Sequence, residues 1–340
     1  MDLKIKSSLL PIFAGIIILI WAIAGFFYHQ ATVSVGKNTH SITLSIPPGA
    51  TLKKISKDLK NLSLIRNASA FRLLANIRQK QTQIQIGEYE LNQSMPPMDI
   101  LKAITSGKTV LHPITIPEGY RISEIADLLT ETISTNKEIF IKESRNKELL
   151  NKLDITSDSL EGYLFPETYH FSKHTTEKKI IQTMLNTFQQ RMKTRKILNQ
   201  IQSSNMSLHE IITLASLIEK ETGMNGERKH ISSVFHNRLK KKMRLQTDPT
   251  VIYAIENFDG NIRKKDLAID SPYNTYRYKG LPPGPIASPG MKSIVAALNP
   301  IKTNHLYFVS KKDGSHQFSS NLKEHNRAVQ KYQLKKINLH

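Results

Sequence analysis

The chain has 340 residues, of which 39% are hydrophobic, so it is long enough for a membrane anchor and one large or two small folded domains. Its 48 Lys and Arg against 28 Asp and Glu give a formal net charge of +20, which favours an anionic partner. The absence of cysteine excludes disulfides, thiolate metal sites and cysteine nucleophiles.

The N-terminal segment predicts where the chain resides. From Leu9 to Tyr28 the sequence is uncharged and almost wholly apolar, and twenty residues in a helix span a hydrocarbon core of roughly 30 Å. We expect a transmembrane helix over residues 8–28, with a cytoplasmic tail, residues 1–7, whose lysines stay inside. A cleaved signal peptide is the alternative, since residues 22–24 resemble a cleavage site. Both interpretations export the remaining chain, which argues against nucleic acid as its partner.

A strand–turn–helix pattern comes after the predicted polar linker, residues 29–40, and occurs twice at an offset of 70. An I-P-x-G sequence at 46–49 and again at 116–119 precedes apolar residues spaced three and four apart, as in an amphipathic helix. Thr51 and Ser123 are the expected N-caps. Two related α+β modules in series account for this repetition, and chance recurrence of a common unit is the alternative.

The first module, residues 41–112, is predicted as a small βααβ unit followed by a further helix. Its strands are expected at 41–46 and 86–91 and its helices at 52–62, 68–77 and 98–105. This is the architecture of LysM-type glycan-binding modules, although composition does not distinguish them from other small α+β domains.

The second domain, residues 113–340, is predicted as a larger mixed α+β domain with a basic C-terminal helix. Its helices are expected at 122–132, 137–144, 177–201, 208–222, 227–241 and 322–335, and its strands at 306–310 and 317–319. Ser207 and Glu210 form a capping box before the fourth helix. Five of the 15 prolines lie between Pro272 and Pro289, which predicts a long ordered loop there.

The helix predicted over 208–222 carries two carboxylates at its end, Glu219 and Glu221. At about 100° per residue they lie on opposite flanks of the apolar stripe. A carboxylate held on an apolar helix can be partly desolvated, which favours its protonated form and suits it to donate protons. A solvated boundary position is the alternative for each, and helical geometry does not choose between them.

Two loops after this helix carry side chains that hydrogen-bond sugars. These are Gln246, Thr247 and Asp248 in the first loop, and Asn274, Thr275 and Tyr276 in the second. Asp248 precedes a proline and is expected to start a turn, which is more often a structural role. Glu161 and Glu167 form a second acidic cluster, among aromatic residues. The histidines lack metal-ligand spacing, so we expect no metal and no other cofactor.

Seven motifs occur in order along the chain: EGYLFPETY (161–169), IEKET (218–222), RLQTDPTVIY (244–253), SPYNTY (271–276), GLPPGPI (280–286), PG (289–290) and EHN (324–326). Together they resemble the motifs of the YceG-like family of endolytic murein transglycosylases. Two departures are small: Gly223 stands where the family often has Ala, and Ala287 begins a segment where Cys or Ser-Asn-Pro-Gly is common.

The resemblance implies an anchor in the inner membrane, a LysM-like subdomain and a periplasmic catalytic domain. It places the family's single catalytic glutamate at Glu219. Glu221, Glu161 and Glu167 are expected to support it, and the six loop residues to bind sugar. The implied reaction is lytic cleavage between N-acetylmuramic acid and N-acetylglucosamine, with a 1,6-anhydro end as product.

This reaction would limit the length of nascent glycan strands. The expected partners are peptidoglycan, the membrane and wall synthases, and no nucleic acid. A non-catalytic scaffold that binds peptidoglycan and holds wall synthases is the alternative function.

Overall fold

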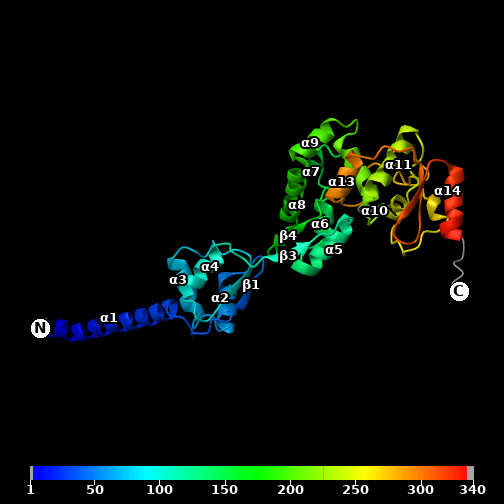
Figure 1. Cartoon of the computed structure of the whole chain (residues 1–340). Helices are drawn as coiled ribbons and strands as arrows, with labels where there is room; N and C mark the ends of the chain where they lie inside the picture. The colour runs from blue at the N-terminus through cyan, green and yellow to red at the C-terminus, as the bar shows by residue number, and fades with distance from the viewer. Residues whose placement is uncertain (1–2, 225, 335–340) are drawn as a thin grey trace, which may run out of the picture. The chain divides into compact units, whose positions relative to one another are not determined.

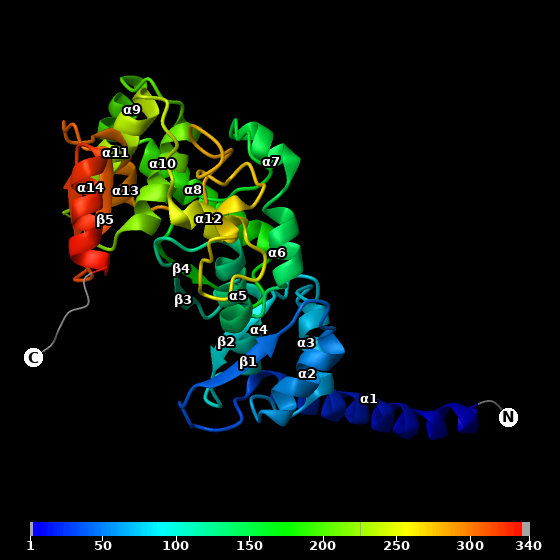
Figure 2. The same ribbon diagram turned by 90° about the vertical axis from the view of Figure 1, so that its right-hand side faces the viewer.

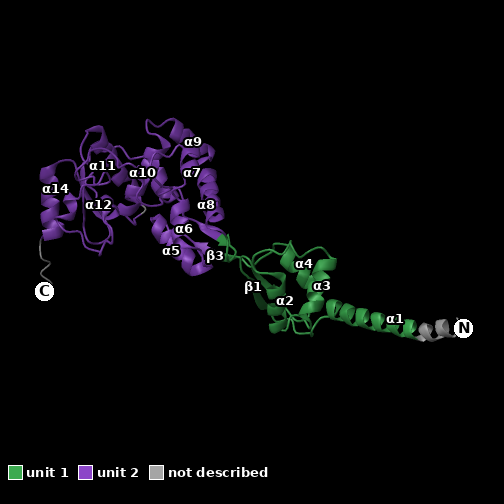
Figure 3. Ribbon diagram, turned by 180° about the vertical axis from the view of Figure 1, so that it is seen from behind, with its two compact units in different colours: residues 1–112, 170–175 green, residues 113–169, 176–340 purple. Residues whose placement is uncertain are grey.

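The computed structural model describes residues 3–224 and 226–334 and confirms an α+β chain. It divides into two compact units (Figure 3): Met1–His112 with His170–Thr175, and Pro113–Tyr169 with Thr176–His340. The functions given to the two predicted domains stay predictions.

The N-terminal helix α1 (Leu3–Thr32) is drawn in blue in Figure 1. Its part Ile12–Thr32 is long and apolar enough to cross a membrane. The helix continues through Thr32 and so includes the first residues of the predicted linker. The segment after the helix is fastened to the first unit, since Arg66 Nη2 donates to the carbonyls of Ser34 and Val35, each at 3.0 Å.

The rest of the first unit contains the elements expected for the small module. They are β1 (Ile42–Ile46), α2 (Leu52–Asn61), α3 (Ala68–Ile77), β2 (Gly87–Leu91) and α4 (Pro97–Thr105). The strands β1 and β2 pair antiparallel, with Ile42 opposite Leu91. The helices bury apolar side chains such as Leu59 and Phe71 in one core. Thr51 caps α2 as predicted, accepting a hydrogen bond from the Lys54 N–H at 3.3 Å.

The remaining elements run from β3 onward: β3 (His112–Thr115), α5 (Ile122–Ile133), α6 (Lys137–Glu143), α7 (Lys147–Lys152), β4 (Thr168–Phe171), α8 (Glu177–Met192), α9 (Arg195–Gln202), α10 (Leu208–Glu221), α11 (Arg228–Lys240), α12 (Asp248–Ala254), the 3₁₀ turn Asp266–Ala268, α13 (Met291–Leu298), β5 (Tyr307–Ser310), β6 (His316–Ser319), α14 (Leu322–Val329) and the π turn Gln330–Leu334. β3 pairs with β4, and β5 with β6.

Helix α10 is the central element of the second unit. It contacts α11, α12 and α13, and Figure 2 shows α12 alongside it. From Ile211 to Ile218 its residues are buried on every side. A helix surrounded in this way holds the side chains at its last turn in fixed positions.

Several predicted details differ from the structure. The helix expected over 177–201 is broken between α8 and α9, where Thr194 takes the N-cap position of α9. The N-cap of α5 is Arg121 and not Ser123. The N–H of Ile122, the first residue of α5, donates to the carboxylate of Glu161 at 3.1 Å, so an acid distant in sequence satisfies this helix N–H.

Two loop predictions have different outcomes. Asp248 begins helix α12 rather than an isolated turn, because the following proline suits the first turn of a helix. The proline-rich segment is irregular and ordered as predicted, with Asn274, Ile286 and Ala287 buried. The terminal helix ends at Val329, and residue 335, where it was expected to end, lies outside the described residues.

The predicted capping box stabilises the start of α10. Ser207 Oγ accepts from the Glu210 N–H at 3.2 Å, and Glu210 Oε2 accepts from the Ser207 N–H at 2.8 Å. Ser207→Ala is therefore expected to lower the free energy of unfolding by about 1 kcal/mol, because one helix N–H loses its acceptor. Urea denaturation measures this change, and an unaltered midpoint would contradict it.

Candidate active site

A polar pocket of about 380 Å³ in the second unit collects side chains from distant parts of the chain. Pockets of this volume are typical of small-ligand sites. Its lining residues are Glu221, Arg238, Leu245, Gln246, Asp248, Tyr276, Tyr307, Phe308, Leu322 and His325.

Glu221, the last residue of α10, is half-buried and contributes a carboxyl group to the pocket. One carboxyl oxygen accepts a hydrogen bond from the hydroxyl of Thr247. Burial, reinforced by the nearby charge of Asp248, raises the pKa of Glu221 to about 7, although the Thr247 hydrogen bond opposes the shift. A carboxyl group with this pKa is partly protonated at neutral pH and can donate a proton.

The loop that faces Glu221 is held by a buried arginine. Arg238 donates from Nη1 to the carbonyl of Leu245 at 2.8 Å and to Gln246 Oε1 at 3.3 Å. Its guanidinium also lies over the ring of Tyr307, 5.1 Å from the centroid. Arg238 therefore fixes the loop and orients the amide of Gln246.

Asp248 and Tyr276 join the two polar loops at the pocket. The Tyr276 hydroxyl donates to Asp248 Oδ1 at 2.5 Å. Asp248 is thus a second carboxylate on the pocket that holds Glu221.

Three of the six predicted sugar-binding residues, Thr247, Asn274 and Thr275, are buried beneath these loops. Asn274 Nδ2 donates to the carbonyls of Leu267 and Ile269, at 3.1 and 2.8 Å. Thr275 Oγ1 accepts from the Thr247 N–H at 3.1 Å. In this structure these side chains brace the loops, and their assignment as sugar contacts stays a prediction. Gln246, Asp248 and Tyr276 line the pocket, and their contact with sugar stays a prediction.

Glu219 lies on the other flank of α10, as the helical spacing predicted. Its Oε1 accepts from Arg228 Nη2 at 2.9 Å, and its Oε2 accepts from the Gly290 N–H at 2.9 Å. The Glu219 and Arg228 side chains are 5% and 6% exposed. Glu118 lies close by, and burial together with the charge of Glu219 raises its pKa. Within the described chain, Glu219 does not line the Glu221 pocket.

Glu161 and Glu167 are placed elsewhere in the second unit. Glu161 is buried against the first residue of α5, Ile122, and burial raises the pKa of Glu161 to about 7. It lines a different pocket, with Arg121 and Tyr253. Glu167 forms an ion pair with Arg191. Neither glutamate lines the Glu221 pocket, as far as the structure describes the chain, so their supporting role stays a prediction.

Comparison with known proteins supports the resemblance that the seven motifs carry. A model of the YceG-like family matches residues 44–331. The chain belongs to the YceG-like family.

Relatives of this YceG-like chain include curated and solved proteins. One from Bacillus subtilis (strain 168), named endolytic murein transglycosylase, is 39% identical over 308 residues, covering 86% of this chain and 85% of the relative. One of the same name from Streptococcus pneumoniae (strain D39) is 33% identical over 329 residues, 87% of this chain but 59% of the relative. A crystal structure of a putative YceG-like protein from Listeria monocytogenes has a TM-score of 0.60 and 37% identity, covering 85% of this chain and 99% of that one.

The sequence analysis assigned no role in the site to three residues that line the Glu221 pocket: Arg238, Tyr307 and His325. Arg238 was expected only as part of the helix over 227–241, and Tyr307 only as part of the strand over 306–310. His325 belongs to the EHN motif, which was the available signal. Its ring stacks on Tyr307 at 5.1 Å between centroids, and burial lowers its pKa. Its buried Nδ1 has no hydrogen-bond partner among the described residues.

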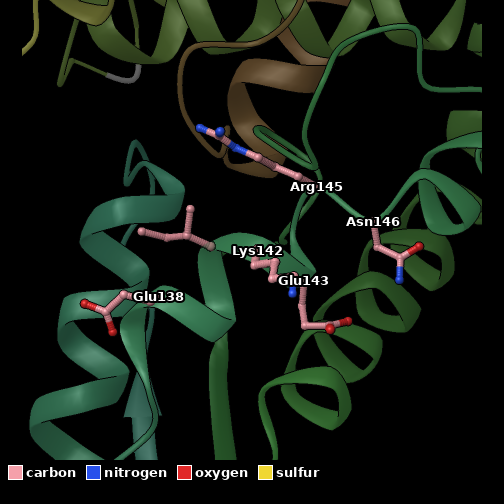
Figure 4. A pocket seen from close by; sticks show the side chains of 6 residues that line it. Glu138, Lys142, Glu143, Arg145 and Asn146 are labelled. Atoms are coloured by element: carbon pink, nitrogen blue, oxygen red, sulfur yellow. The ribbon is translucent and has the colours of Figure 1, made fainter.

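A larger opening of about 600 Å³ lies beside α6 of this YceG-like chain. Figure 4 shows that its side chains spread around the opening, with Glu138 and Glu143 pointing to opposite sides. Because the Glu221 pocket instead gathers residues of several family motifs around the carboxyl groups of Glu221 and Asp248, we place the candidate active site there.

Proposed function

We propose that the chain is a membrane-anchored peptidoglycan lytic transglycosylase with its catalytic unit outside the cytoplasmic membrane. Its relatives in two species are named endolytic murein transglycosylase. The observation that carries the proposal is the polar pocket in which the carboxyl group of Glu221 lies with Gln246, Asp248 and Tyr276.

We propose Glu221, rather than Glu219, as the proton donor. A proton donor must reach substrate and carry a proton, and Glu221 lines the pocket with a raised pKa. Glu219 accepts hydrogen bonds from a buried arginine and a backbone N–H, and within the described chain its side chain does not line this pocket. The resemblance placed the acid at Glu219, and that assignment stays a prediction, which variants of both glutamates test.

A single carboxyl group can serve both steps of the reaction. Protonated Glu221 donates to the oxygen that links C1 of N-acetylmuramic acid to N-acetylglucosamine. The C1–O bond breaks, and its electron pair stays on the departing oxygen. The resulting carboxylate then removes the proton from the muramic acid C6 hydroxyl. The C6 oxygen bonds to C1 and closes a 1,6-anhydro ring, so Glu221 is protonated again and no water is consumed.

Hydrolysis is the second candidate reaction, and Asp248 is the observation that favours it. Ordinary glycosidases use two carboxyl groups, one as acid and one as base or nucleophile. Asp248 and Glu221 line the same pocket. Mass analysis of the ends formed on purified murein distinguishes the reactions, because hydrolysis leaves reducing ends and the lytic reaction leaves anhydro ends.

We further propose that α1 anchors the chain with its N-terminus in the cytoplasm. The helix carries lysines before its apolar part. The first unit would bind glycan as a LysM-like module, for which its β1-α2-α3-β2 order is the support. Wall synthases are the proposed partners, and shorter nascent strands the proposed outcome.

The pH profile of the enzyme should report the pKa of its acid. Above a pKa of about 7, Glu221 loses the proton it must donate. We therefore expect kcat/KM to fall about tenfold for each pH unit above this value. Initial rates of murein solubilisation from pH 5 to 9 measure the profile. A rate that stays constant up to pH 9 would contradict Glu221 as the acid.

Asp248→Asn should shift this profile. The negative charge of Asp248 contributes to the raised pKa of Glu221. Its removal is expected to lower that pKa, move the alkaline fall to lower pH and reduce the rate at pH 7. Tyr276→Phe is the matched control, because it removes a pocket hydroxyl and keeps the charge. If both variants shifted the alkaline decrease in kcat/KM equally, the charge of Asp248 would not be the cause of the raised pKa of Glu221.

A further inference from the structure

Helix α3 of the first unit has an apolar face that its own core does not cover. Phe71, Leu74 and Ala75 pack into the core. Leu73 and Ile77, four residues apart and therefore on one face, are 46% and 70% exposed. Large exposed aliphatic side chains grouped in this way on a folded module are typical of a surface that contacts a membrane or another protein.

This face lies directly beside the outer end of α1. A hollow of about 380 Å³ is lined by Phe27 and Tyr28 of α1, by Leu73 and Ile77 of α3, and by Met98. Helices α1 and α3 are in contact, and both belong to the first unit. The apolar surface of the membrane helix is thus continuous with that of α3.

The junction that sets this arrangement is fastened by hydrogen bonds. Arg66 Nη2 holds the carbonyls of Ser34 and Val35, just after α1. The Gly36 N–H donates to the carbonyl of Gln93 at 3.0 Å. The first unit therefore does not hang from a loose linker, and the position of α1 in a bilayer fixes the position of α3.

The depth of α3 in the membrane follows from the length of the membrane-spanning part of α1. Ile12–Thr32 has 21 residues, or roughly 30 Å at helical rise, which equals the hydrocarbon thickness. Phe27 and Tyr28 lie within about 8 Å of its outer end, where aromatic residues mark the membrane interface. Leu73 and Ile77, which share the hollow with them, lie at the same depth.

The charge around this face complements a phospholipid surface. Helix α3 contains no acidic residue, while Arg72 and Arg78 flank the exposed pair and Lys80 comes shortly after. Apolar side chains rimmed by cations are typical of helices that lie in the headgroup region, buried about 5–10 Å deep.

We propose that the outer leaflet of the membrane covers this α3 face, with Leu73 and Ile77 among the acyl chains and Arg72 and Arg78 at the phosphates. The inference rests on the proposed anchoring by α1. In this arrangement the first unit contacts the bilayer through both α1 and α3, and the rest of its surface remains available to other partners.

Site-directed spin labels test this proposal in the full chain, which has no native cysteine to interfere. Leu19→Cys, Ile77→Cys and Ile86→Cys are labelled singly and reconstituted into vesicles of phosphatidylethanolamine and phosphatidylglycerol. Ile86 is the matched control, since it is an aliphatic residue of the same unit that is 46% exposed and does not line the hollow. Collision with oxygen reports lipid, and collision with a water-soluble nickel chelate reports water.

We expect the labels at 19 and 77 to collide mainly with oxygen and the label at 86 mainly with nickel. Equal nickel accessibility at 77 and 86, with 19 in lipid, would overturn the docking and leave the anchor intact. A label at 77 shielded from both reagents would mean that protein covers the face, and would also overturn the proposal. A label at 19 in water would refute the anchor itself, and the docking with it.

Discussion

Glu221→Gln is expected to lower kcat for murein cleavage by roughly 10²–10⁴-fold, the usual contribution of a general acid. The amide keeps the size of the carboxyl group and can still accept from the Thr247 hydroxyl, so the pocket should remain formed. It has no proton to give to the glycosidic oxygen. Release of soluble muropeptides from purified murein measures the loss.

Glu219→Gln is the matched variant, two residues away on the same helix. We expect its folded fraction to cleave murein within a few-fold of the wild-type rate. The opposite pattern, with turnover kept in Glu221→Gln and lost in folded Glu219→Gln, would return the acid to the position that the family resemblance gave it.

The second large effect concerns stability. Glu219→Gln is expected to lower the free energy of unfolding by about 3–5 kcal/mol, because it removes the carboxylate from a buried pair with Arg228. At roughly 2–4 °C for each kcal/mol, the melting temperature of a domain of this size should fall by on the order of 10 °C. Calorimetry of the full chain in detergent measures the change.

Glu221→Gln should behave differently in the same experiment. Because burial raises the pKa of Glu221 above its usual value, its contribution to stability is present at low pH and is lost as the pH rises through about 7. A neutral glutamine avoids that loss, so this variant should not be destabilised at pH 8. Equal destabilisation of both variants would contradict the roles given to the two carboxylates.

The sequence was sufficient to predict the helices and strands whose ends and faces depend on neighbouring residues. The capping box at Ser207 and the apolar run after it located α10 and placed Glu219 and Glu221 on opposite flanks. Choosing between the two glutamates was beyond the pattern, because their environments come from distant segments. Arg228 and the Gly290 N–H bind Glu219, whereas the hydroxyl of Thr247 binds Glu221.

Local pattern also failed where elements are short or side chains are buried. Helices α7, α12 and α13 have six to eight residues and were not predicted, because so few residues give a weak helical period. The similarly short α6 was expected from its sequence. Thr194, a residue type that caps helices, was a visible signal for the break between α8 and α9. The polarity of Asn274 and Thr275 suggested sugar contacts, but polarity does not reveal burial beneath a loop.

The most direct test of the proposed function is the mass of the glycan ends that the full-length protein forms on purified murein. We expect 1,6-anhydromuramic ends from the wild type, lighter by one water than reducing ends, and their loss in Glu221→Gln. Reducing ends from the wild type would contradict the lytic reaction, and unchanged anhydro ends from Glu221→Gln would contradict its single-acid mechanism.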